Sequence, residues 1–127
     1  MALNVLVVVD SPVMRSMLIR TLRLSGLPIT SVHQAGDGVE ALHLLDVTDI
    51  DFALIDVDMP AMTGEALIAT IRADARHAAV ALIVVSTDGS PAHVATLTRQ
   101  GVSFMHKPFT PEQIRSNVLR VLGVTDG

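Results

Sequence analysis

The chain of 127 residues contains no cysteine, tryptophan or tyrosine, and only three phenylalanines. Without cysteine it can form neither a disulfide framework nor a thiolate metal site, which fits a reducing compartment, so we expect a cytoplasmic protein. With so few aromatic side chains, it offers almost no surface on which nucleic-acid bases could stack. Half of the residues are hydrophobic, yet no apolar run approaches the ~18 residues that a membrane span needs. We therefore expect binding to neither nucleic acid nor membrane.

Basic residues are few, and one type is almost missing. The formal net charge is −4 at pH 7, and the nine basic residues form no cluster, which argues against a nucleic-acid surface. Eight of the nine are arginines, and the single lysine, Lys107, stands directly before Pro108. Lysine is a compact charge on a flexible stem, whereas the rigid fork of arginine is harder to fit around one phosphoryl oxygen. We interpret Lys107 as a cation directed at a phosphoryl group.

Five short apolar segments, rich in β-branched residues, predict β-strands. They are continuous rather than alternating, which is typical of strands buried on both faces of a parallel sheet. The segments are residues 5–9, 29–33, 52–55, 81–85 and 102–105.

Start and stop signals predict helices between these segments. Ser-Pro or Thr-Pro pairs at positions 11–12, 90–91 and 110–111 each place a capping hydroxyl before a proline at the first helical position. Gly26, Gly101 and Gly123 stand where a helix ends in the left-handed conformation. In the first helix, Met14 and Met17 share an apolar stripe with two leucines, and we expect both methionines in the core.

The alternation of strands and helices predicts an α/β fold of five βα units, which is a flavodoxin-like doubly wound (βα)5 arrangement with a parallel sheet of order 2-1-3-4-5. No linker or low-complexity tract interrupts the pattern, so we expect one domain over residues 1–127. In such a sheet the carboxyl ends of the strands share one edge, and ligands bind there.

Polar residues follow four of the five predicted strands at that edge. Asp10 follows the first strand, Asp56 the third, Ser86 the fourth and Lys107 the fifth. Each residue alone is more often a turn, cap or solvated loop residue than part of a site. Two carboxylates, a hydroxyl and an ammonium group at one edge are chemically complementary, and together they predict a phosphoryl site.

Four segments resemble the signatures of a known family. "VVVDSPVMRSML", "ALIDVDMPAMTG", "ALIVVSTDG" and "MHKPF" are similar, in order and spacing, to those of the response-regulator receiver domain, the phospho-accepting module of bacterial two-component signalling. The resemblance extends from about residue 3 to residue 123. It implies a chemotaxis-regulator-like protein that is not an enzyme in the usual sense, although it assists its own phosphorylation and dephosphorylation.

The resemblance also implies roles for particular residues. Asp56 is then the phosphorylated carboxylate, and Asp10, Asp56 and the backbone carbonyl of Asp58 hold Mg²⁺ or Mn²⁺. Ser86 and Lys107 bind phosphoryl oxygens, and the peptide bond before the following proline is cis. Phe104 is the switch aromatic that moves together with Ser86.

Partners follow from the same resemblance. The phosphoryl donor is a sensor histidine kinase or a phosphotransfer protein, and the signal passes to a downstream protein target. The protein itself is a monomer or a weak homodimer. In the family the output surface lies around the fifth strand and its flanking helices, which directs attention to His93, Phe104 and Ile114.

One position departs from the family pattern. Receiver domains usually carry two acidic residues at the end of the first strand, whereas this chain has Val9 and Asp10. The missing carboxylate lowers the expected metal affinity, unless the side chain of Asp58 substitutes for it. A pseudo-receiver, an interaction module that is not phosphorylated, is therefore the alternative.

Asp88 has two interpretations. It stands two residues after Ser86, where an acid could orient a water molecule for hydrolysis of the phosphoryl group. An acid at this position could equally cap the next helix.

Two other classes fit part of the pattern. The sequence "DVD" at 56–58 matches the aspartyl-nucleophile phosphatases of the haloacid dehalogenase type, but it follows the third strand instead of the first. A flavodoxin-like flavin carrier shares the fold, yet this chain has neither tryptophan nor tyrosine to enclose the flavin ring.

Overall fold

The computed structural model describes residues 2–58 and 64–123. Within these residues, strands and helices alternate along the chain, and a short 3-10 helix, η1 (Ala75–His77), precedes the fourth strand. The strands are β1 (Leu3–Val8), β2 (Ile29–Ala35), β3 (Phe52–Asp56), β4 (Ala81–Ser86) and β5 (Ser103–His106). The α-helices are α1 (Pro12–Leu24), α2 (Gly38–Val47), α3 (Gly64–Ala73), α4 (Pro91–Thr98) and α5 (Pro111–Val121).

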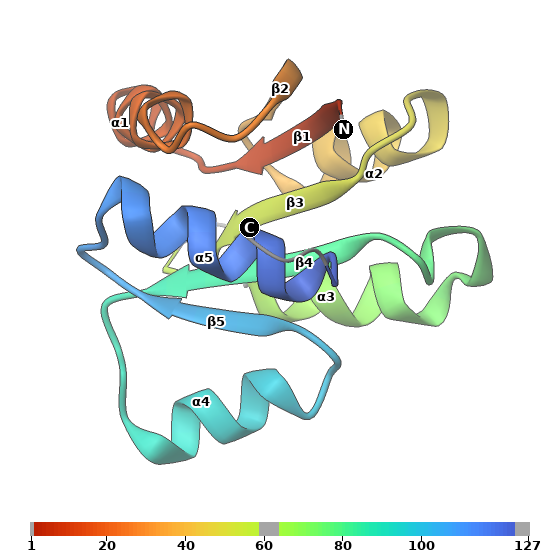
Figure 1. Cartoon of the computed structure of the whole chain (residues 1–127). Coiled ribbons are helices and arrows are strands. Elements are labelled where there is room, and N and C mark those ends of the chain that lie inside the picture. Colours follow the sequence, from red (N-terminus) through yellow and green to blue (C-terminus); the bar gives the residue numbers. More distant parts are fainter. Residues whose placement is uncertain (1, 59–63, 124–127) are drawn as a thin grey trace.

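The strands form one parallel sheet of order β2-β1-β3-β4-β5, as predicted. Figure 1 shows that the arrows of β1, β3, β4 and β5 point to the same side of the molecule, and β2 runs parallel to β1, so the carboxyl ends lie along one edge. The strand order reverses between β1 and β3, which are neighbours in the sheet. This is the position at which such sheets bind ligands.

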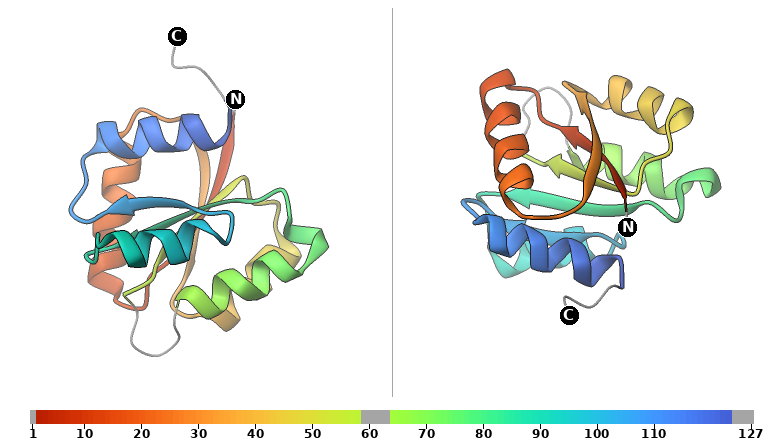
Figure 2. Two further views of the ribbon diagram at one scale, coloured as in Figure 1. Left: turned by 90° about the horizontal axis from the view of Figure 1, so that it is seen from below. Right: turned by 45° about the horizontal axis from the view of Figure 1, so that its top comes forward.

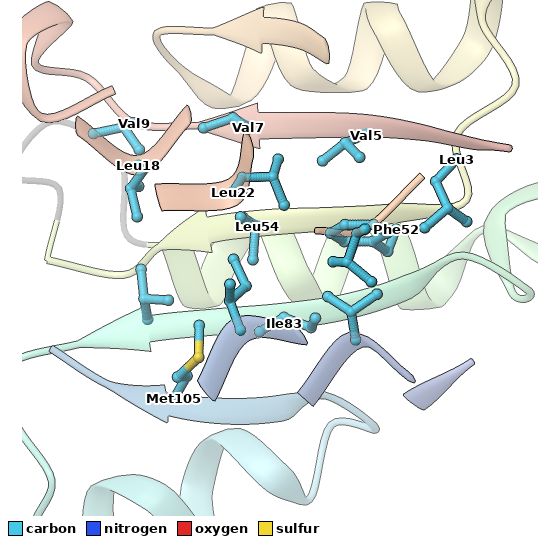
Figure 3. Packing of buried hydrophobic residues seen from close by; sticks show 14 of the residues in the cluster. Leu3, Val5, Val7, Val9, Leu18, Leu22, Phe52, Leu54, Ile83 and Met105 are labelled. Atoms are coloured by element: carbon cyan, nitrogen blue, oxygen red, sulfur yellow. The ribbon is translucent and has the colours of Figure 1, made fainter. Parts of the chain in front are cut away.

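Helices cover both faces of the sheet and bury two apolar layers. Figure 2 shows α5 and α3 on opposite sides of the strands. One buried cluster joins α1 and α5 to the sheet, and Figure 3 shows Val9 and Leu18 among its members. The second cluster packs α2, α3 and α4 against the other face. The site at the strand ends is therefore held by a rigid, two-sided core.

Burial differs between inner and outer strands. Every residue of β3 is buried, and β4 is buried apart from its first residue, as the continuous apolar runs predicted. The prediction of burial on both faces is wrong for β2 and β5, which form the two edges of the sheet and are mostly half-exposed or exposed. An edge strand has a neighbour on one side only, so fewer side chains can cover it.

The prediction for the first helix was partly wrong. Leu18 and Leu22 are buried, but Met14 is 37% and Met17 58% exposed. Met14 and Met17 therefore lie at the rim of the core. The apolar stripe of α1 is wider than the sheet surface that it covers.

The predicted helix boundaries are largely confirmed. The Ser11 hydroxyl accepts a hydrogen bond from the N–H of Met14, and Thr110 forms a reciprocal capping box with Gln113. Ser90 is also an N-cap residue, although its side chain makes no capping hydrogen bond. The three predicted terminal glycines all have positive φ, which residues with a Cβ rarely adopt. They are Gly26 (+80°), Gly101 (+75°) and Gly123 (+71°).

No helix in the described part of the chain is both long and apolar enough to cross a bilayer.

Candidate functional site

The predicted site residues lie at the carboxyl edge of the sheet. Asp56 is the last residue of β3, Ser86 is the last residue of β4, and Lys107 directly follows β5. The strand register aligns these ends, because Asp56 is opposite Val85 in the sheet and the Lys107 N–H donates to the carbonyl of Ser86 at 2.9 Å. Side chains from three separate segments are thereby brought to one place.

Lys107 and Asp56 are in direct contact. The Lys107 ammonium lies 2.9 Å from Oδ1 of Asp56, and their side chains are only 13% and 7% exposed. Oδ1 of Asp56 also accepts a hydrogen bond of 2.9 Å from the Asp58 N–H. The peptide bond between Lys107 and Pro108 is cis, as the resemblance implied. Among residues 2–58 and 64–123, no donor is within hydrogen-bond distance of the second oxygen of Asp56.

The side chain of Asp58 takes a position that the sequence did not predict. Its Oδ1 accepts a 2.7 Å hydrogen bond from the Ser86 hydroxyl, and its Oδ2 accepts a 2.9 Å bond from the Thr87 N–H. Oδ2 also lies 3.2 Å from the Lys107 ammonium. The buried hydroxyl of Ser86 is thus bonded to Asp58 and not to Asp56. Sequence reasoning identified Ser86 and Lys107 but missed the Thr87 N–H, because a backbone donor has no residue-type signal.

These contacts shift two pKa values in opposite directions. Burial, the largest single influence, raises the pKa of Asp58, but the hydrogen bonds from Thr87 and Ser86, with the nearby ammonium, outweigh it. The pKa of Asp58 is therefore held below its ordinary value. Burial lowers the pKa of Lys107, but its hydrogen bonds and charge attraction to Asp56 and Asp58 raise it above its ordinary value. Asp58 is charged at neutral pH, and Lys107 carries the matching positive charge.

A glycine allows Val57, between the two acids, to approach α3. A Cβ built at Gly64, the first residue of α3, would lie 2.6 Å from Cγ1 of Val57 and 2.8 Å from its Cα. Real Cβ atoms essentially never come so close to backbone. Gly64 is thus required by the close approach between the end of β3 and α3.

The proposed metal ligands are oxygen donors, which Mg²⁺ prefers. Asp10 is exposed and stands two residues after the end of β1. The last residue of β1, Val8, is aligned with Ile55 of β3, and Ile55 directly precedes Asp56. Val9, in contrast, is fully buried in the apolar layer shared with α1. The side chain of Val9 is thus part of the core. The remaining set of Asp10, Asp56 and the Asp58 carbonyl suits a hard cation, with one carboxylate fewer than the family pattern.

Another group of possible ligands lies elsewhere. Within the described residues, Asp46, Asp74 and His77 place their ligand atoms within 4.8 Å of one another. The guanidinium of Arg76 already pairs with both acids, at 3.2 Å from Asp46 and 2.7 Å from Asp74. We interpret this group as a structural ion-pair network between α2 and η1.

Two further predicted residues flank the site. Asp88 is exposed, and its Oδ1 accepts a 3.0 Å hydrogen bond from the Ser90 N–H before α4. This bond closes a local turn and does not cap the helix, because the N-cap residue of α4 is Ser90. Phe104 lies opposite Val84 in the sheet, half-buried, with its ring at 88° to that of His93 and 6.3 Å between centroids. The predicted output residue Ile114 is fully buried and packs in the core, so it cannot contact a partner directly.

Comparison with known proteins identifies the family. A family model described as "Response regulator receiver domain" matches residues 5–119. The chain belongs to this family. The resemblance found in the sequence is therefore confirmed, and receiver membership disfavours the phosphatase and flavin-carrier alternatives.

Relatives of this receiver are similar over almost their whole length. Chemotaxis protein CheY1 of Helicobacter pylori (strain ATCC 700392 / 26695) is 36% identical over 126 residues, covering 98% of this chain and 100% of that protein. A chemotaxis protein CheY homolog of Campylobacter jejuni is 35% identical over 127 residues, covering 98% and 96%. The structure of Vibrio cholerae chemotaxis protein CheY4 superposes with a TM-score of 0.83 at 30% identity, covering 95% of this chain and 99% of that one.

Proposed function

We propose that this receiver accepts a phosphoryl group on Asp56 and that the modification changes its binding to a downstream protein. The observation that carries this proposal is the contact between buried Asp56 and Lys107, with a 2.9 Å bond to one carboxylate oxygen and the other oxygen left without a described donor. A carboxylate can act as a nucleophile toward phosphorus. Phosphoryl transfer depends mainly on positioning and on neutralising charge, which the adjacent ammonium supplies.

The reaction follows from the groups in place. The free oxygen of Asp56 attacks the phosphorus of a phosphohistidine on a sensor kinase or phosphotransfer protein. The O–P bond forms as the N–P bond breaks, and the electron pair of that bond returns to the imidazole. Lys107 and Ser86 then donate hydrogen bonds to phosphoryl oxygens.

The residues present suit a divalent metal ion. Asp10, Asp56 and the backbone carbonyl of Asp58 would hold Mg²⁺ or Mn²⁺, since hard cations are usually bound by one or two carboxylates together with the phosphate. When bound, the metal neutralises negative charge on the phosphoryl oxygens. Because Val9 is buried and has no ligand atom, we expect a weaker metal site than in receivers with two acids here.

A groove beside the site is proposed as the docking surface for the phosphodonor. The exposed methionines of α1, Met14 and Met17, line it together with Lys107, so the groove reaches the phosphoryl site itself. Helix α1 also carries arginines and no acid. We propose that an apolar helix face of the histidine-containing partner, bordered by acidic residues, lies in this groove.

A pseudo-receiver remains the second candidate, and one observation favours it. Because residue 9 is a valine, the metal site has one carboxylate fewer, and the Val9 side chain is buried in the core. A receiver that cannot hold the metal would bind partners without being phosphorylated.

Intact-mass spectrometry after incubation with acetyl phosphate and Mg²⁺ separates the two candidates. The phospho-accepting receiver gains the mass of one phosphoryl group, and both Asp56→Asn and removal of Mg²⁺ by a chelator abolish the gain. No gain in the wild type, or a gain that persists in Asp56→Asn, would overturn the proposal.

The role of Asp88 is tested on the phosphorylated protein. If Asp88 orients water for hydrolysis, Asp88→Ala lengthens the lifetime of the phosphoryl group. An unchanged lifetime would leave Asp88 with only local roles, in the hydrogen bond from the Ser90 N–H and the contact with His93.

A further inference from the structure

The carboxylate of Asp58 occupies hydrogen-bond donors that a phosphoryl group on Asp56 needs. Ser86 donates to one of its oxygens at 2.7 Å, and the Thr87 N–H donates to the other at 2.9 Å. The Lys107 ammonium approaches the second oxygen at 3.2 Å. We call these three donors the anion seat.

Two donors of the anion seat, the Ser86 hydroxyl and the Thr87 N–H, cannot serve two anions at once. A serine hydroxyl carries one hydrogen and a backbone amide carries one hydrogen. As long as both point at Asp58, neither can bond a phosphoryl oxygen. Charge adds to this exclusion, because a phosphoryl group brings roughly 1.5 to 2 negative charges. That charge would stand next to the charged carboxylate of Asp58, and the two anions would repel each other.

We propose that Asp58 is an internal competitor of the phosphoryl group, whose carboxylate must leave the anion seat before a phosphoryl group on Asp56 can bind there. This inference rests on the proposed function. In the unphosphorylated protein, Asp58 holds Ser86 and Thr87 in place, and the Ser86 oxygen in turn accepts the Asp88 N–H at 3.0 Å. Phosphorylation exchanges one anion for another in the same seat.

The competition is measured with fluoroberyllate, an anion that mimics a phosphoryl group on a carboxylate, added together with Mg²⁺. Asp58→Asn removes the charge but keeps the shape, and Asp58→Ala removes both oxygens, while the backbone carbonyl stays in each variant. Glu65→Gln is the charge-matched control. Its carboxylate lies in the first turn of α3, 3.9 Å from His93 and outside the anion seat.

We expect both Asp58 variants to bind fluoroberyllate roughly 10-fold more tightly than the wild type, because no charge-assisted hydrogen bonds have to be broken first. Glu65→Gln should change the affinity by less than about twofold, since it removes only a screened charge. If the Asp58 variants bind no more tightly than Glu65→Gln while the wild type still binds, the inference fails and the proposed function stands. If none of the four proteins binds fluoroberyllate with Mg²⁺, the proposed function fails and the competition fails with it.

The amide proton of Thr87 provides a second readout, and the comparison of wild type with Asp58→Ala needs neither metal nor a phosphoryl analogue. A hydrogen bond to a carboxylate shifts this proton downfield in the NMR spectrum, so Asp58→Ala should move it upfield. Fluoroberyllate should restore the downfield position in the same variant. A Thr87 amide signal that is the same in wild type and Asp58→Ala would contradict the claim that the Thr87 N–H donates to Asp58.

Discussion

Lys107 donates a hydrogen bond of 2.9 Å to Asp56, although the two residues are 51 positions apart in the sequence. The contact exists because β3 and β5 both end at the same edge of the parallel sheet, separated by β4 alone. It pairs the single lysine of the chain with a buried carboxylate. The fold thereby places the two groups of the proposed chemistry side by side.

Removing this cation should destabilise the protein. Lys107→Met leaves Asp56 buried without its partner, and breaking a buried pair in this way costs about 3 kcal/mol of unfolding free energy. Urea unfolding of the two proteins at neutral pH measures the loss. The double variant Lys107→Met/Asp56→Asn should recover part of it, because the buried charge of Asp56 is gone although Asp58 still lacks its nearby ammonium. A loss below about 1 kcal/mol, within the usual range of exposed pairs, would contradict the importance of the pair.

Restoring an acid at the end of β1 should strengthen metal binding at a cost in stability. Val9→Asp adds the carboxylate that the family pattern has, so we expect several-fold tighter Mg²⁺ binding in calorimetry. The unfolding temperature should fall, because Val9 is fully buried and a charge replaces an apolar side chain. Val9→Ala, which shortens the side chain without adding an oxygen, is the control and should bind Mg²⁺ like the wild type. Equal Mg²⁺ affinity in Val9→Asp would show that position 9 does not face the metal.

The α1 groove should matter more for a protein donor than for a small one. Met17 is 58% exposed and lines the groove, so Met17→Glu places a charge where the apolar face of the partner is proposed to lie. Transfer from a phosphorylated histidine-containing protein should slow at least tenfold more than labelling by acetyl phosphate, as burying an unpaired charge costs several kcal/mol. Val47→Glu, at an exposed apolar position on α2, is the matched control and should slow neither reaction selectively. If Met17→Glu slowed both reactions equally, the substitution would act on the phosphorylation site at Asp56, and the proposed docking in the groove would be contradicted.

The Asp74–Arg76 pair should contribute stability that is lost in acid. The hydrogen bonds from the Arg76 side chain and N–H lower the pKa of Asp74 from 3.8 to about 2. Because the pKa is lower in the folded state, the contribution is complete above about pH 4 and declines as the pH falls toward 2. Urea unfolding of wild type and Asp74→Asn at pH 6, 4 and 3 measures it. The difference between the two proteins should shrink between pH 4 and 3, and a difference that stays constant would contradict the lowered pKa.

Much of the fold was predictable because local signals agreed with one another. The strands β1, β3 and β4 have neighbours on both sides and helices on both faces, so apolar residues fill them almost without interruption. Their residues are accordingly almost all buried. Proline at the first helical position and glycine with positive φ fixed the helix ends within a residue or two. The predictions failed at boundaries of the core. Met14 and Met17 have the periodicity of buried residues, yet periodicity does not tell how wide the opposing sheet surface is.

The site was predictable only to the level of residue types at strand ends. The convergence of Asp56, Ser86 and Lys107 follows from parallel topology, and the structure brings Asp56 and Lys107 into contact. The bond from Ser86 to Asp58 did not follow, because two aspartates two residues apart offer the same chemistry to the same hydroxyl. Side-chain geometry alone decides between them. The Thr87 N–H could not be predicted either, because a backbone donor has no residue-type signal.

The most direct test of the central claim is to locate the phosphoryl group on the chain. The protein is incubated with Mg²⁺ and a phosphorylated histidine-containing donor, and borohydride then reduces the acyl phosphate to an alcohol that tandem mass spectrometry can locate. We predict homoserine at position 56 in the wild type, and at no position in Asp56→Asn. Modification at another acid, or an unmodified Asp56 after complete consumption of the donor's phosphoryl group, would contradict the account.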